Sequence, residues 1–297
     1  MAFNWPVFIT RTRTAAIFVA VMAAGLLTGK WSFLFLFSLI HFGCWYEYQQ
    51  LMGKIFPSYR DITPFHRIGV MLAGWCMMLF ATTEHWMLGS VSLSSLGFWL
   101  GLTLLFVLPM IEILFTRNLD LKSILVSIGG LAYISLSLAM MIHIRSGDIW
   151  MNRMAEDSIF RILAISDGFL LPLLIIASIW INDTMAYIVG SLIGRTPLSK
   201  ISPKKTWEGT VGGIVLSVAI MSFAGWRANG IWQHYAFISL IAAVAGTFGD
   251  LFESKLKRMA GVKDSGNFMP GHGGFLDRFD SLLFAIPFVW LYALAFM

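Results

Sequence analysis

The chain has 297 residues, of which 58% are hydrophobic and 12% are charged, and its formal net charge is +5 at pH 7. Soluble proteins average about 25% charged residues, so this composition excludes an ordinary soluble protein and indicates a polytopic membrane protein. The excess of Lys and Arg does not indicate nucleic-acid binding, because cytoplasmic loops of membrane proteins are rich in these residues.

Apolar stretches recur along the whole chain at lengths that suit a bilayer, which an α-helix of about 20 residues can cross. We therefore expect an all-α fold with about nine transmembrane helices and no separate soluble domain. The expected spans cover residues 14–29, 31–48, 68–83, 94–115, 124–144, 165–190, 209–227, 234–252 and 279–297.

The distribution of basic residues predicts the orientation of these spans. With the N-terminus inside, 16 of the 21 Lys and Arg residues fall on the inner side and 5 on the outer side. The positive-inside rule then predicts an N-in, C-out topology with a cytoplasm-facing site, where nucleotides are available. The expected location is the bacterial cytoplasmic (inner) membrane. A cleaved signal peptide after Arg13 is the weaker interpretation, because the next apolar stretch begins almost at once.

Residues 1–162 have the composition of transmembrane scaffold helices, rich in Leu, Phe, Ala and Gly. Glu47 is the exception, since it lies near the end of the second expected span. A carboxylate there either sits at the membrane interface or faces a polar cavity. We expect the remaining residues, 163–297, to form the catalytic region.

The expected span at residues 165–190 is interrupted by three polar residues, Asn182, Asp183 and Thr184. An ionisable residue at membrane depth indicates a functional site. A basic segment follows, and it opens another span at Gly209. Lysines and helix N-termini suit anionic phosphates, although the lysines alone could also serve only to set the topology.

The densest charge lies between Asp250 and Asp280, where five acids and five bases occur within 31 residues. At about 100° per residue, Asp250 and Glu253 share one helix face, and Asp277 and Asp280 share a face of the next helix. Two acidic faces joined by a glycine turn could hold two metal ions about 4 Å apart, as in phosphoryl transfer. An ordinary solvated loop is the weaker interpretation, because such a loop does not require His-Gly-Gly next to Asp-Arg-Phe-Asp.

This stretch resembles the signature of the CDP-diacylglycerol synthases, also called phosphatidate cytidylyltransferases. A second block of the chain resembles that family's other shared motif, so the resemblance covers about residues 180 to 281. Met269 stands where the signature prefers Leu, Ile or Phe. The matching residues of the signature are Ser254, Leu256, Lys257, Arg258, Lys263, Asp264, Gly266, Pro270, His272, Gly273, Gly274, Phe275, Asp277, Arg278, Phe279 and Asp280; those of the second block are Asp183, Thr184, Ala186, Tyr187, Gly190, Gly194, Arg195 and Ser202 to Gly209.

The resemblance implies an enzyme that joins CTP to phosphatidic acid in the bilayer, giving CDP-diacylglycerol and pyrophosphate with Mg²⁺. It implies that Asp250 and Asp277 bind metal in a two-cation site. The identity of the second cation is left open. A homodimer is allowed by the sequence but is not required by it. The catalytic residues it implies are Lys263, Asp264, His272 and Asp280; the substrate-binding residues are Asp183, Arg195, Ser202, Lys204, Lys205, Thr206, Ser254, Lys257, Arg258 and Arg278.

Two alternatives stay open at this point. The first is a CTP-dependent transferase that acts on another lipid phosphate or on a polyprenol. The second is an ion-coupled transporter, which also places aspartates in broken helices at mid-membrane. A transporter is disfavoured because the charges concentrate in one terminal third and no internal repeat is visible. No P-loop and no GxGxxG motif after a strand occurs in the chain.

Overall fold

The computed structural model describes residues 5–83, 86–115, 120–146, 168–229, 232–268 and 273–297. These residues form two compact units. The first unit is Met1–Ile142 with Met259–Phe279, and the second is His143–Arg258 with Asp280–Met297. The boundary at residue 162 between scaffold and catalytic region is a functional division, and it stays a prediction.

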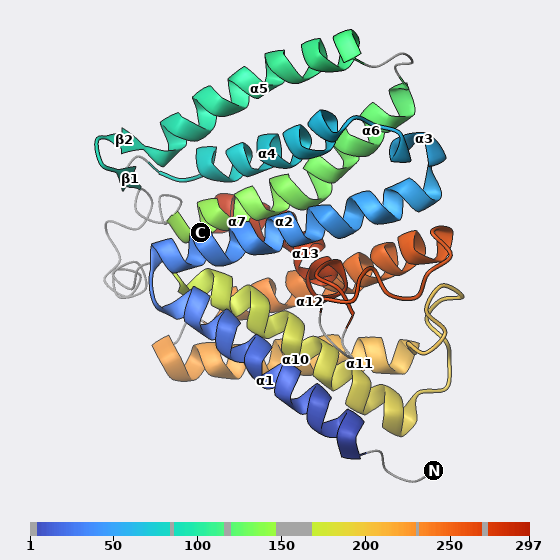
Figure 1. Ribbon diagram of the computed structural model, residues 1–297. Helices are drawn as coiled ribbons and strands as arrows, with labels where there is room; N and C mark the ends of the chain where they lie inside the picture. Colours follow the sequence, from blue (N-terminus) through green and yellow to red (C-terminus); the bar gives the residue numbers. More distant parts are fainter. Residues whose placement is uncertain (1–4, 84–85, 116–119, 147–167, 230–231, 269–272) are drawn as a thin grey trace. The chain divides into compact units, whose positions relative to one another are not determined.

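The predicted all-α fold is confirmed, since the only strands among the described residues are the two-residue pair β1 (Met87–Leu88) and β2 (Val91–Ser92). Figure 1 shows the helices, coloured along the sequence from blue at the N-terminus to red at the C-terminus. The helices are α1 (Trp5–Leu27), α2 (Lys30–Ile55), α3 (Pro57–Arg60), α4 (Pro64–Phe80), α5 (Leu93–Phe115), α6 (Leu121–Gly130), the π-helix η1 (Leu131–Leu136), α7 (Ser137–Ser146), α10 (Leu170–Ile193), α11 (Trp207–Asn229), α12 (Trp232–Met259) and α13 (Leu276–Phe296).

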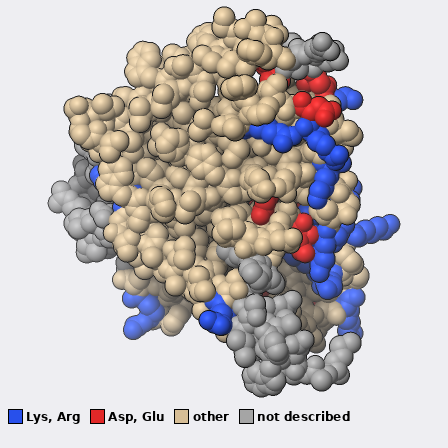
Figure 2. Space-filling model, viewed as in Figure 1, with Lys and Arg blue, Asp and Glu red and all other residues tan. Residues whose placement is uncertain are grey.

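Six helical stretches in the described part of the chain are long and apolar enough to cross a membrane, and the chain is an integral, multi-pass membrane protein. Most of the surface visible in Figure 2 is uncharged, as lipid-facing helices require. The count of about nine stays a prediction, because Thr12–Leu27 and Pro64–Phe80 are shorter and α2 is not among the six. The six stretches are Leu93–Phe115, Leu121–Ser146, Leu170–Ile193, Trp207–Ala228, Trp232–Met259 and Leu276–Phe296.

In the first unit, a π-helix interrupts the stretch that α6 and α7 otherwise form as α-helix. A π-helical turn holds one more residue than an α-helical turn. Its buried Ser135 hydroxyl accepts a hydrogen bond from Trp45 Nε1 at 2.8 Å and lies 3.0 Å from His41 Nε2. The π-helix therefore meets α2 through a small buried polar cluster.

In the second unit, α10 and α11 pack closely through small residues. A Cβ atom added at Gly213 would lie 2.7 Å from the Cβ of Ala186 and 2.8 Å from the carbonyl oxygen of Asn182. Small residues let transmembrane helices approach to such distances. The connection between these helices, residues 194–206, carries the basic segment.

Candidate functional site

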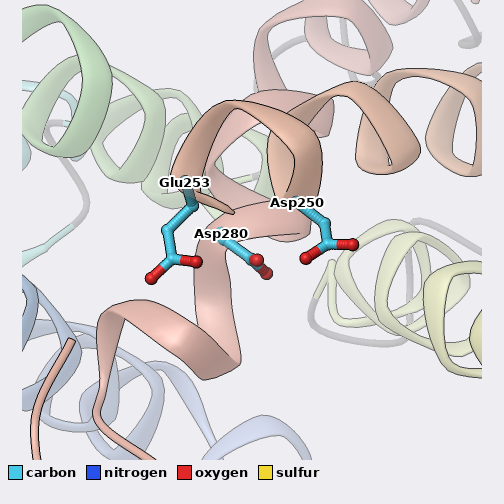
Figure 3. A group of neighbouring side chains, drawn as sticks. All are labelled: Asp250, Glu253 and Asp280. Atoms are coloured by element: carbon cyan, nitrogen blue, oxygen red, sulfur yellow. The ribbon is translucent and has the colours of Figure 1, made fainter. Parts of the chain in front are cut away.

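Three carboxylates of the second unit lie close together. Asp250 and Glu253 extend from α12 and Asp280 from α13, and one oxygen of each lies within 4.8 Å of the others. Figure 3 shows the three side chains side by side. Glu253 is fully buried and Asp280 is 6% exposed. Carboxylates this close and this buried repel one another unless cations compensate them, and an all-oxygen donor set fits a hard divalent cation such as Mg²⁺.

Two lysines of the same unit face these carboxylates. Lys205 forms an ion pair with Asp250, and Lys257 forms an ion pair with Glu253 one helical turn away. Burial lowers the pKa of Lys205, while the charges of Asp183 and Asp280 act in the opposite direction. Three carboxylates and two ammonium groups leave an excess of negative charge, which suits an added cation.

The fold of residues 194–206 places Lys205 beside Asp250. The Leu198 N–H donates to the Lys205 carbonyl at 2.8 Å, and the Lys205 N–H donates to the Ser202 carbonyl at 3.1 Å. Glu208, in the first turn of α11, accepts from the backbone N–H groups of Arg195 and Thr196 at 3.1 Å. The loop is therefore held at both ends by hydrogen bonds within the unit.

Gly249 brings α12 and α13 together next to the carboxylates. A Cβ atom there would lie 2.5 Å from the Asp280 carbonyl oxygen and 2.7 Å from the Cβ of Phe284. Real Cβ atoms do not approach backbone oxygens this closely, so any larger residue must push the helices apart. The spacing of Asp250 and Asp280 therefore depends on the missing side chain at Gly249.

We expect Gly249→Ala to lower the free energy of unfolding by about 1–3 kcal/mol, the usual cost of overpacking. Gly246→Ala is the matched control on the same helix, because its nearest neighbour would lie at an ordinary 3.4 Å. Thermal unfolding of the two variants in detergent micelles measures the difference. Equal unfolding temperatures would show that the close approach at Gly249 does not matter.

In the first unit, the Asp277 carboxylate is held by the segment before α13. Its Oδ2 accepts from Ser265 N at 2.8 Å, from Ser265 Oγ at 2.9 Å and from Gly274 N at 2.8 Å. Glu47 lies at the same segment and accepts a hydrogen bond from Ser265 Oγ at 2.7 Å. Glu47 is 4% exposed, so the structure favours polar surroundings within the protein over the membrane interface.

The structure brings many of the predicted site residues into the second unit. Asp277 belongs to the first unit, and its relation to Asp250 stays a prediction. His272 lies outside the described residues. The second unit holds Asp183, Arg195, Ser202, Lys204, Lys205, Thr206, Asp250, Ser254, Lys257, Arg258 and Asp280, and the first holds Lys263, Asp264, Asp277 and Arg278.

Three acids that have defined partners or neighbours in the structure were not among the predicted catalytic, substrate-binding or metal-binding residues. Glu253 was recognisable, since it lies three residues after Asp250 on the same helix face. Glu208 gave only the signal of an acid in the first turn of a helix. Glu47 contacts residues more than 200 positions away, so no local pattern reveals its partner.

Comparison with known proteins identifies relatives over this region. The family model described as "Cytidylyltransferase family" matches residues 9–296. The chain is 40% identical over 157 residues, 52% of its length, to "Phosphatidate cytidylyltransferase" of Synechocystis sp., and 47% identical over 115 residues, 38% of its length, to the protein of that name from Bacillus subtilis. The match spans about half of each relative, 51% and 43% of their lengths respectively.

Proposed function

The chain belongs to the cytidylyltransferase family, and from this premise we propose that it transfers CMP from CTP to phosphatidic acid, giving CDP-diacylglycerol and pyrophosphate. The observation that carries the proposal is the cluster of Asp250, Glu253 and Asp280 with its two lysines. The names of the relatives support the same reaction. Family membership also disfavours the transporter that the sequence left open.

In the proposed reaction, an oxygen of the phosphatidate phosphate attacks the α-phosphorus of CTP. The bond from the α-phosphorus to the oxygen that bridges it to the β-phosphorus breaks, and pyrophosphate leaves. Such transfers depend on positioning and on stabilisation of the charge that develops on the phosphate oxygens. The protein must therefore hold positive charge, from basic side chains and from bound metal, at fixed positions around the phosphates.

The residues of the second unit have suitable chemistry for this task. Asp250, Glu253 and Asp280 would hold Mg²⁺, which when bound neutralises phosphate charge. Lys205 and Lys257 would contact phosphate oxygens, and the loop around Lys205 limits its freedom. The family motif supports Asp277 as a further metal ligand, with the second ion unassigned, and supports a role for Lys263 and Asp264 in orienting the reacting phosphates.

We place the reaction at the cytoplasmic face of a bacterial inner membrane, with the N-terminus inside. The support is the excess of Lys and Arg in the segments assigned to that side, together with the need for CTP. A homodimer remains a prediction.

Single cysteines introduced at positions 204 and 263 are expected to react with a membrane-impermeant maleimide only after the membrane has been permeabilised, which gives the reagent access to the cytoplasmic side. A cysteine at position 297 should react from the outside of intact cells. The native cysteines, Cys44 and Cys76, are buried, and a variant without them gives the background. Labelling of position 263 from outside alone would reverse the proposed orientation.

Purified protein in micelles with labelled CTP, Mg²⁺ and phosphatidic acid tests the reaction directly. We expect label in a lipid product and release of pyrophosphate. Parallel reactions with a polyprenol and with an ether-linked lipid phosphate distinguish the other CTP-dependent transferases. The proposal fails if folded protein forms no labelled lipid from phosphatidic acid.

A further inference from the structure

Glu47 makes three hydrogen bonds to one distant segment of the first unit. It lies on α2, more than 200 positions before that segment in the sequence, and it is 4% exposed. Its Oε1 accepts from Phe275 N at 2.9 Å, and its Oε2 accepts from Leu276 N at 2.8 Å and from Ser265 Oγ at 2.7 Å. A buried carboxylate is costly unless donors compensate it, so these three donors and Glu47 depend on one another.

Two of the three donors, the Phe275 and Leu276 N–H groups, lie at the start of α13, where backbone N–H groups have no partner within the helix and carry partial positive charge. Local capping residues normally satisfy such groups. Here the carboxylate comes from another helix, 228 and 229 residues away from Phe275 and Leu276. Glu47 therefore fixes the point at which α13 begins relative to α2.

Ser265 connects Glu47 to Asp277. Its hydroxyl oxygen lies 2.7 Å from Glu47 Oε2 and 2.9 Å from Asp277 Oδ2, and its backbone N–H also donates to Asp277 Oδ2. A serine hydroxyl has a single proton, so it donates to one carboxylate at a time. The positions of the two carboxylates are consequently coupled through one side chain.

The glycines of this segment make room for Glu47. A Cβ atom at Gly266 or at Gly274 would overlap the Glu47 carboxylate. Gly274 also donates its N–H to Asp277 at 2.8 Å. The second glycine of the His-Gly-Gly sequence is thus explained by the approach of Glu47, and a substrate is not needed to explain it.

We infer that Glu47 is a positioning residue: through Ser265 and the backbone of Gly274 to Leu276, it sets the orientation of the Asp277 carboxylate for cytidylyl transfer. This inference rests on the proposed function, because it assigns Asp277 to that reaction. In this inference Glu47 acts through Ser265 and the backbone, and no direct contact with the reacting atoms is assigned to it. Its removal should affect turnover and local order more than substrate binding.

Glu47→Gln tests the inference with little change of shape. An amide presents only one acceptor oxygen, so at least one of the three bonds must be lost. We expect kcat to fall about 10–100-fold, the usual effect of losing a group that orients a ligand, with KM for CTP and for phosphatidic acid changed far less. A loss confined to KM would overturn the inference.

Hydrogen–deuterium exchange supplies a readout that needs no activity. In protein without substrate, the amides of Gly274, Phe275 and Leu276 are expected to exchange at least about tenfold faster in Glu47→Gln, because lost hydrogen bonds lower the local opening free energy. Unchanged exchange there would overturn the inference even if activity fell. This arm also separates the two proposals, since it remains informative if the wild-type chain makes no CDP-diacylglycerol.

Glu112→Gln is the matched control. Glu112 is also a buried carboxylate of the first unit, at 9% exposure, and it accepts from the Thr63 hydroxyl at 3.0 Å. We expect it to leave exchange at Gly274 to Leu276 unchanged. If both glutamine variants loosen this segment equally, Glu47 contributes only general stability and the inference is wrong.

Ser265→Ala provides a second, milder variant should Glu47→Gln fold poorly. Its kcat should also fall, and the double variant should lose much less than the product of the two single losses. Non-additivity of this kind is the mark of residues that act through one another. Strictly multiplicative losses would show that Glu47 does not act through Ser265.

Discussion

Asp250→Asn is expected to reduce CDP-diacylglycerol formation by more than about 100-fold at saturating Mg²⁺. Groups that merely orient a metal ligand already cost about 10–100-fold when they are removed, and a direct ligand should cost more. The carboxylate lies within 4.8 Å of Glu253 and Asp280, so a neutral amide would remove one of three charged oxygen donors. Asp277→Asn is expected to have the same effect, on the strength of the family motif.

The measurement is turnover of labelled CTP by folded protein, with thermal unfolding recorded in parallel. Asp61→Asn serves as the control, because Asp61 is exposed beside α3 in the first unit. A structural ion pair between Asp250 and Lys205 would show itself as a lower unfolding temperature with activity retained. If the Asp250→Asn variant keeps more than a tenth of the wild-type activity, Asp250 is not a metal ligand.

Lys205→Ala is expected to raise KM for CTP or for phosphatidic acid by about 10–150-fold. A charge-assisted contact contributes about 1.5–3 kcal/mol, and Lys205 is held beside Asp250 by its ion pair and by the backbone of its loop. Lys204→Ala is the natural comparison, because the neighbouring side chain is exposed. Its effect should be several-fold smaller, as for a mobile surface charge.

Steady-state kinetics with each substrate varied in turn measures both effects. The rise in KM for one substrate alone would identify the phosphate that Lys205 contacts. Equal KM values for the Lys204 and Lys205 variants would mean that the loop supplies only general positive charge. The ion pair with Asp250 would then have no part in substrate binding.

Helical periodicity predicted that Asp250 and Glu253, two members of the second unit's carboxylate cluster, share one helix face. The spacing from Asp250 to Glu253 and from Asp277 to Asp280 is a property of any α-helix, so each pair could be read from sequence. The closeness of Asp280 to Asp250 could not, because it depends on how α12 and α13 cross at Gly249. That crossing is a tertiary property.

Contacts between distant segments were beyond the sequence for the same reason. Glu47 could be recognised as an exception among apolar residues, yet its partner Ser265 lies 218 positions away. Among the spans, hydropathy found the six apolar stretches, but it does not decide the status of α2. That helix carries the buried polar residues His41 and Glu47 within its length.

The π-helix at Leu131–Leu136 has a consequence for length variation within the protein family. Because a π-turn amounts to a one-residue insertion in an α-helix, deletion of one residue there would restore uninterrupted α-helix. The residues after it would then keep their present face, because the deletion removes only the extra residue that the wider turn holds. The buried Leu138, Met141 and Ile142 would stay buried on the same side of the helix. Relatives with one residue fewer at this point should therefore carry the same apolar stripe downstream of the gap, with an uninterrupted α-helix in place of the π-turn.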